Sequence, residues 1–290
     1  MTIQLIEMSF ALISAFLFAL GVQFQNIGLS SITARQGTAI SISSAALMYW
    51  ILAPFYLDIS NFTKPTILIF ILIGIFRPSL SANLAVAGTR FLGPTLSTTL
   101  SSTTPLFAGI MGVLWLGENL TWQLIIGTAG VLSATFALSL NAGVSINWPI
   151  WALILPIGAA LIRSLAHFLT KIGMTDIPDP YFAGLISFSI SSVITITLLK
   201  LNRKITPITW KSRGVMWFIL SGIIMGTAII SLNTALMHGN LTLVIPIVAI
   251  SPIFTMLLSI IIFKKEIINA RIIFALLIVV PSIICIALTH

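Results

Sequence analysis

Long runs of apolar residues dominate the chain, and short polar clusters separate them. Residues 68–76 and 257–263 carry apolar side chains on every side of a helix, without the alternation expected of barrel strands. Each run approaches the length of about 20 residues that a helix needs to cross a bilayer. The pattern therefore predicts ten transmembrane helices, at residues 5–25, 36–57, 65–88, 94–116, 121–140, 149–171, 180–200, 213–236, 241–263 and 271–288.

Composition restricts the protein to the membrane. Of 290 residues, 58% are hydrophobic and 7% are charged, and the mean hydropathy is +1.14. Six acidic residues are too few for a water-facing surface, which excludes a soluble enzyme. Ten crossings of about 20 residues leave roughly 90 for connections, too few for an extramembrane domain. The first run lacks a basic leader and exceeds a signal-peptide core, so we expect it to remain as the first helix.

The charged and metal-binding residue types exclude further classes of function. The net charge of +8 is dispersed over short connections and forms no basic face, so we expect no nucleic-acid partner. Cys285 is the single cysteine, and the three histidines (His167, His238 and His290) are scattered. We therefore expect no disulfide framework, no metal site and no cofactor.

The two halves of the chain resemble each other. Residues 102–107 align with residues 249–254 at an offset of 147, and Glu118 aligns with Glu266 at an offset of 148. The alignment divides the chain into repeats at residues 1–145 and 146–290, with five helices each. An odd number of crossings per repeat gives the two repeats opposite orientations, and transporters commonly place the substrate site between such repeats.

Several short motifs make the chain similar to a known superfamily. They are GTRFLGP at residues 88–94, TPLF at 104–107, LWLGENLT at 114–121, and Gly127. In this order, and with the repetition, the chain resembles the ten-helix EamA-type branch of the drug/metabolite transporters. The resemblance implies a secondary transporter with a central cavity lined mainly by helices one, three, four, six, eight and nine. The second half departs from the pattern, because KKE at residues 264–266 replaces the glycine-glutamate pair and Pro281 interrupts the tenth helix.

Two arginines are the main candidates for substrate recognition. Arg77 and Arg163 lie near the middle of the third and sixth predicted helices, where an arginine costs about 2.5–3.5 kcal/mol on insertion scales. All six acidic residues lie at or near helix ends, so neither arginine has an evident carboxylate partner. We expect one or both to bind a carboxylate or phosphate of the substrate. The alternative is that they snorkel or bond to carbonyls and waters.

His167 follows Arg163 by one helical turn, so the two side chains share a face. Because histidine titrates near neutral pH, His167 is a candidate proton carrier. The alternative is a hydrogen-bonded packing residue. Coupling to a proton or another ion therefore stays open.

The fourth helix begins with an unusual run of hydroxyl residues. Eight of the ten residues at 95–104 are Ser or Thr, and Pro105 follows directly. A proline frees a carbonyl one turn earlier, which hydroxyls can satisfy, so we expect a bend with exposed polar backbone. Cavity lining and ordinary helix packing both remain open for the hydroxyls of Thr98, Ser101 and Ser102. Corresponding bends, and a paired hinge role, are expected at Pro105, Pro246 and Pro252.

Four amides complete the polar candidates. Gln23 and Gln25 lie near the end of the first helix, Asn83 in the third and Asn233 in the eighth. Interhelical hydrogen bonding is the usual role of such residues, and contact with the substrate is the alternative role for each.

The orientation in the membrane has two conflicting indications. Basic residues concentrate in the odd-numbered connections, so the positive-inside rule places both termini outside the cytoplasm. The family resemblance implies termini inside. The sequence leaves this choice open, and a bacterial inner membrane is the expected location.

These features predict an all-α integral membrane protein that moves a small polar metabolite, such as an amino acid or organic anion, across the bilayer by alternating access. A cationic drug exporter of the same fold is the alternative. A membrane-embedded enzyme is a weaker one, because the sequence has no GxSxG, no HExxH and no two acids within one apolar stretch. A selectivity-filter loop, as in a channel, is also absent from the sequence.

Overall fold

The computed structural model describes residues 2–139, 149–201, 210, 212–262 and 270–288. Its regular elements are all helical. They are α1 (Thr2–Gly28), α2 (Ala34–Tyr56), η1 (Ile59–Thr63), α3 (Ile67–Phe76), α4 (Ser79–Ser101), α5 (Thr104–Leu116), α6 (Trp122–Ser139), η2 (Ile150–Leu153), α7 (Ile154–Asp176), α8 (Pro180–Leu201), α9 (Arg213–His238), α10 (Leu241–Val248), α11 (Ser251–Ile261) and α12 (Ala270–Ala287).

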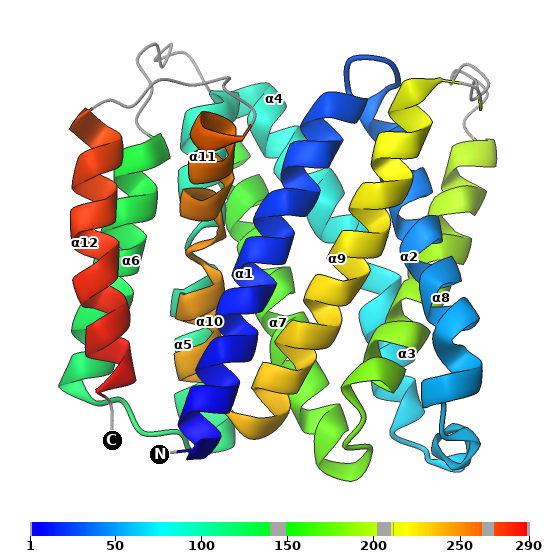
Figure 1. Cartoon of the computed structure of the whole chain (residues 1–290), viewed down its shortest axis with the longest axis horizontal. Helices are drawn as coiled ribbons and strands as arrows, with labels where there is room; N and C mark the ends of the chain where they lie inside the picture. Colours follow the sequence, from blue (N-terminus) through cyan, green and yellow to red (C-terminus); the bar gives the residue numbers. More distant parts are fainter. Residues whose placement is uncertain (1, 140–148, 202–209, 211, 263–269, 289–290) are drawn as a thin grey trace.

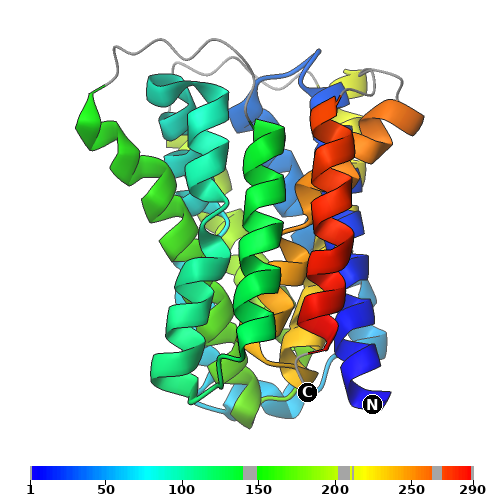
Figure 2. The same cartoon turned by 90° about the vertical axis from the view of Figure 1, so that its left-hand side faces the viewer.

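The predicted fold class is confirmed. Within the described residues, seven helical spans are long and apolar enough to cross a membrane, and three shorter apolar helices complete the ten crossings. The helices stand side by side, and both chain ends lie at the same end of the bundle (Figures 1 and 2). We call this end the terminal end and the opposite one the distal end.

Three crossings are interrupted near their middle. The third breaks between α3 and α4 at Arg77, the fourth between α4 and α5, and the ninth between α10 and α11 at Ala249 and Ile250. Pro78, Pro105 and Pro252 follow the breaks, and proline supplies no N–H for the helical ladder. The predicted crossing at residues 65–88 is confirmed as one span, Ile67–Ala85, but its helix is interrupted at Arg77 because the residue before a proline is disfavoured in a helix.

The chain reverses its direction within α4. The Ser97 hydroxyl donates to the carbonyl of Ala85, at 3.3 Å, although the two residues are twelve apart in sequence. In a straight helix, twelve residues would span about 18 Å. The reversal therefore lies at the polar break that the sequence predicts at residues 89–93, and α4 contains the end of the third crossing and the start of the fourth.

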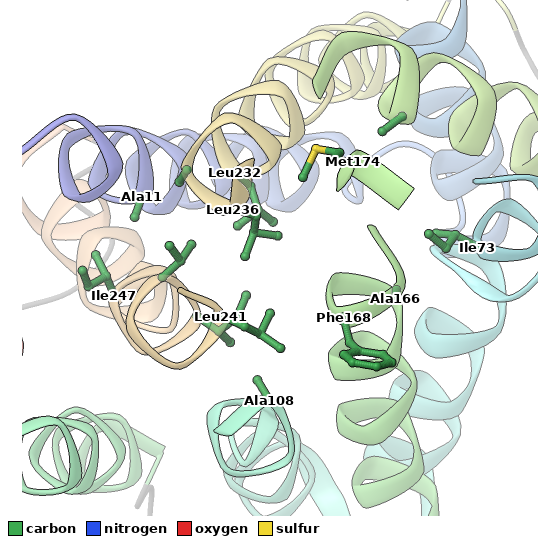
Figure 3. Packing of buried hydrophobic residues seen from close by; sticks show 14 of the residues in the cluster. Ala11, Ile73, Ala108, Ala166, Phe168, Met174, Leu232, Leu236, Leu241 and Ile247 are labelled. Carbon is green, nitrogen blue, oxygen red and sulfur yellow. The ribbon is translucent and has the colours of Figure 1, made fainter. Parts of the chain in front are cut away.

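Close helix contacts hold the bundle together. The helix α9 packs against α1 and α2, and α12 packs against α6 at one side of the molecule (Figure 2). Side chains from α5, α7, α9 and α10 converge in the interior, including Ala108, Phe168, Leu236 and Leu241 (Figure 3). Small residues permit the tightest approaches. At Gly222 in α9, a Cβ atom would overlap the carbonyl oxygen of Ser41 in α2.

Charge is divided between the two ends. The described acidic residues all lie toward the terminal end, in α1, in the connections after α2 and α5, and around the turn from α7 to α8 (Figure 1). Of the described basic residues, Arg35, Lys200 and Arg213 lie at the distal end, whereas Lys64 and Lys171 lie toward the terminal end. The division of basic residues that the sequence shows between connections is therefore a division between the two faces of the membrane.

The α2–α9 contact generates a stability prediction. We expect Gly222→Ala to lower the free energy of unfolding by about 1–3 kcal/mol, the usual cost of forcing extra atoms into a packed interior. Thermal unfolding in detergent measures this change. Gly109→Ala in α5 is the matched control, because a Cβ there meets no atom within 4 Å. Equal effects of the two substitutions would contradict the predicted role of the contact.

The charge division generates a prediction of orientation. Because basic connections stay in the cytoplasm, we expect the distal end to be cytoplasmic and both termini to lie on the opposite side. A C-terminal alkaline phosphatase fusion should be active, and a C-terminal green fluorescent protein fusion should stay dark. The reverse pair of results would show that the family's usual orientation prevails over the charge division.

Candidate functional site

A cavity of about 230 Å³ lies between the helices in the middle of the bundle. Crossings one, three, six and eight line it, as the resemblance implies, and crossings two and seven also contribute. The fourth and ninth crossings do not appear in its described lining. The lining residues are Phe18, Gln25, Thr38, Ser41, Ile42, Ile73, Arg77, Pro78, Ala82, Thr170, Ala183, Gly184, Ser187, Phe188, Met225, Ile229 and Asn233.

Arg77 is the one charged residue in this described lining. It lies in extended conformation at the break between α3 and α4, and its backbone N–H donates to the carbonyl of Ile73 at 2.8 Å. No hydrogen bond or ion pair joins its guanidinium group to another residue that the structure describes. The break therefore places an arginine beside the cavity with its donors available to a ligand.

Uncharged polar groups surround the rest of the cavity. The side chain of Asn233 is 4% exposed, and its amide donates to the carbonyl of Pro180 at 3.1 Å. The Gln25 amide lies 3.3 Å from the Met225 sulfur. With Thr38, these groups offer hydrogen bonds and no negative charge.

Arg163 donates a hydrogen bond to a backbone carbonyl at the break in the fourth crossing. Its Nη2 donates to the carbonyl of Ser101 at 2.6 Å, and its Nε donates to the Thr104 hydroxyl at 3.4 Å. Ser101 is the residue whose carbonyl would bond to position 105 in an unbroken helix, and Pro105 has no N–H to offer. This arrangement matches the carbonyl-bonding alternative for Arg163, which does not appear in the cavity lining. Contact between Arg163 and a substrate stays a prediction.

His167 lies close to both arginines. Its side chain is 5% exposed, and its Nδ1 has no hydrogen-bond partner among the described residues. The charges of Arg77 and Arg163 both act on its imidazole, and the charge of Arg163 acts on Arg77. We call these three residues the basic cluster. The one ion pair between described residues, Lys171 with Glu118, lies elsewhere, so no described carboxylate neutralises the cluster.

The other predicted residues are spread over several locations. The Gln23 amide donates to the carbonyl of Thr255 in α11, at 2.6 Å. Asn83 is exposed and bonds back to its own helix at Ser79. The buried hydroxyl of Ser101 has no partner in the described structure. Ser102 lies in the break between α4 and α5, and the side chain of Thr98 lies outside the described residues.

The predicted hinge prolines lie at or near two equivalent breaks. Pro105 is in the first turn of α5, Pro252 is in the first turn of α11, and Pro246 is inside α10. The breaks after α4 and α10 occupy the positions that the repeat aligns. Movement about these prolines stays a prediction.

Sequence reasoning missed several lining residues. Thr38, Ser41 and Ser187 line the cavity, but serine and threonine are common throughout these helices and give no signal of their own. Pro78 did carry a signal, because the residue before a proline is disfavoured in a helix.

Comparison with known proteins agrees with this architecture. The model of the EamA-like transporter family matches the chain twice, over residues 5–140 and 150–288. No curated protein matches the sequence. A crystal structure of a protein is similar with a TM-score of 0.82 and 13% identity, over 96% of this chain and 95% of the other. At this identity the structural match establishes the fold alone. The two family matches cover almost the whole chain, so this protein belongs to the EamA-like transporter family, whose members are membrane transporters and not enzymes.

Proposed function

We propose that this transporter moves a small solute with a carboxylate or phosphate group, such as an amino acid or organic anion, by alternating access. The observation that supports the proposal is Arg77 beside the cavity, with no carboxylate partner among the described residues. Guanidinium offers paired donors that match the geometry of both anionic groups.

The size of the cavity favours a small metabolite. Its volume of about 230 Å³ is below the roughly 300–1,000 Å³ that is typical of pockets for drug-sized ligands. Asn233, Gln25 and Thr38 provide hydrogen bonds for the uncharged part of the solute, and Phe18 and Phe188 provide apolar contacts. A solute of this kind is small and polar at one end.

The electrostatics of the cavity favour an anion over a cation. A cation exporter needs a carboxylate at the binding site to offset the loss of hydration, and the described lining includes none. An anion beside Arg77 would gain from its guanidinium charge and from the nearby charge of Arg163. The structure therefore supports the anionic substrate more strongly than the cationic alternative.

The breaks in the fourth and ninth crossings support a mechanism of alternating access. They occupy equivalent positions in the two repeats, and interrupted helices at the midplane are common in transporters built from inverted repeats. The cavity reaches Gln25, Thr38 and Ala82, which are partly exposed toward the distal end. Toward the terminal end, Met174, Ile177, Tyr181 and Leu236 are buried. This asymmetry corresponds to a state that is open toward the distal end.

Substitution of Arg77 tests the proposed substrate. A thermal-shift screen of purified protein against amino acids, organic acids and nucleotides first identifies a stabilising anion. We expect Arg77→Gln to weaken its binding by about 10-fold to 150-fold, because a hydrogen bond to a charged group contributes roughly 1.5–3 kcal/mol. Arg77→Lys should retain part of the affinity, since it keeps the charge without the paired donors.

The matched control is Lys200→Gln, which removes an exposed positive charge at the distal end. It should leave the affinity unchanged. Unaltered binding of every stabilising anion in Arg77→Gln, with the protein still folded, would overturn the proposed role of Arg77.

A further inference from the structure

A buried ionic contact joins the two halves of the chain at the terminal end. Glu118 lies on the connection between α5 and α6, in the first half, and its side chain contacts the first turn of α10 and Lys171 of α7, both in the second half. We call Glu118, Lys171 and the turn at residues 239–242 the clasp.

Glu118 supplies both carboxylate oxygens to one helix end. Oε1 accepts the N–H of Leu241 at 2.7 Å, and Oε2 accepts the N–H of Thr242 at 2.8 Å. The residue is 8% exposed. A carboxylate at the start of a helix is favourable because it satisfies free N–H groups and lies at the positive end of the helix dipole.

Lys171 holds the same turn from the other side. Its ammonium donates to the carbonyls of Gly239 and Leu236, the latter at 3.3 Å, and lies 3.8 Å from Oε1 of Glu118. The helix α1 also reaches this turn, because a Cβ atom on Gly239 would overlap the Glu7 carboxylate. Segments from both halves therefore converge on one turn between α9 and α10.

The clasp lies next to the part of the cavity that is nearest the terminal end. Thr170, the neighbour of Lys171, lines the cavity, and so does Asn233, which precedes Leu236 by one helical turn. Lys171 with Glu118 is also the one ion pair that the described part of the chain contains. The described ion pair between the two halves is thus at the terminal end.

We propose that the clasp is the latch that keeps the terminal end closed, and that Glu118 and α10 must separate for the cavity to open there. Separation would leave the N–H groups of Leu241 and Thr242 and the Glu118 carboxylate without these partners until water reaches them, and it would break the ion pair with Lys171, which opposes opening. A static helix cap would need the carboxylate alone. The ion pair between Lys171 and Glu118 and the approach of α1 are what make the turn a junction between the two halves. This inference rests on alternating access and does not depend on an anionic substrate.

The test measures from which side the cavity is accessible, and it needs no substrate. In a Cys285→Ala background, Ser187→Cys places a reporter thiol at a partly exposed position of the cavity lining. A membrane-impermeant maleimide is added to either side of oriented vesicles. The parent should label from the distal side. Glu118→Gln and Lys171→Met should each raise labelling from the terminal side by at least about tenfold, the shift expected for loss of a charge-assisted hydrogen bond.

Asp58→Asn is the matched control, because this exposed carboxylate at the same end accepts a hydrogen bond only from its own loop, at Ser60. It should leave labelling from both sides unchanged. Unchanged labelling from the terminal side in folded Glu118→Gln and Lys171→Met would overturn the latch.

Hydrogen exchange in the unaltered protein decides the question even if both variants fail to fold. A latch that opens during the transport cycle should let the amides of Leu241 and Thr242 exchange well before global unfolding. Exchange of these two amides only through global unfolding would show that the clasp is a static cap. Failure of the Arg77 experiments would leave this result unaffected.

Discussion

Positive charge that is held within the membrane without a neutralising acid is the constraint on which the rest of this structure depends. An arginine inside a bilayer must be bonded, hydrated or paired, because an uncompensated charge in an apolar medium is costly. The protein meets this requirement in two ways. Arg163 bonds to the carbonyl that Pro105 frees in the fourth crossing, whereas Arg77 lies beside the cavity.

The proline breaks connect this chemistry to the fold. At Pro105 the break frees the carbonyl of Ser101, which accepts a hydrogen bond from Arg163 of α7, and the hydroxyl of Ser164 donates to the carbonyl of Thr104. At Pro78 the break turns Arg77 out of the helical pattern and toward the cavity lining. The same feature that weakens a transmembrane helix therefore builds the polar interior.

The sequence predicted the fold well because lipid imposes a simple rule. Helices must satisfy their own backbone groups and present apolar side chains, so the ten crossings and their repetition are visible in the order of apolar runs. The interruption at Arg77 was missed, although Pro78 marked it. The reversal within α4 was predicted at the correct place, since glycine and proline lie between the two crossings there.

The site was less predictable, because its contacts join distant residues. Nothing local indicates that Arg163 bonds to Ser101, or that Glu118 caps a helix that begins at Leu241. Hydroxyl residues such as Thr38 and Ser187 acquire a role only from the helices that surround them. The chemical types of the key residues were nevertheless evident, since the acids lie at helix ends and the arginines lie within the crossings.

We propose that Arg77 recognises the negative group of the transported solute. A structure of the protein with a bound solute that stabilises it would test this role. We expect a carboxylate or phosphate oxygen about 3 Å from a guanidinium nitrogen of Arg77. A cationic solute in the cavity, or an anionic group bound away from Arg77, would contradict it.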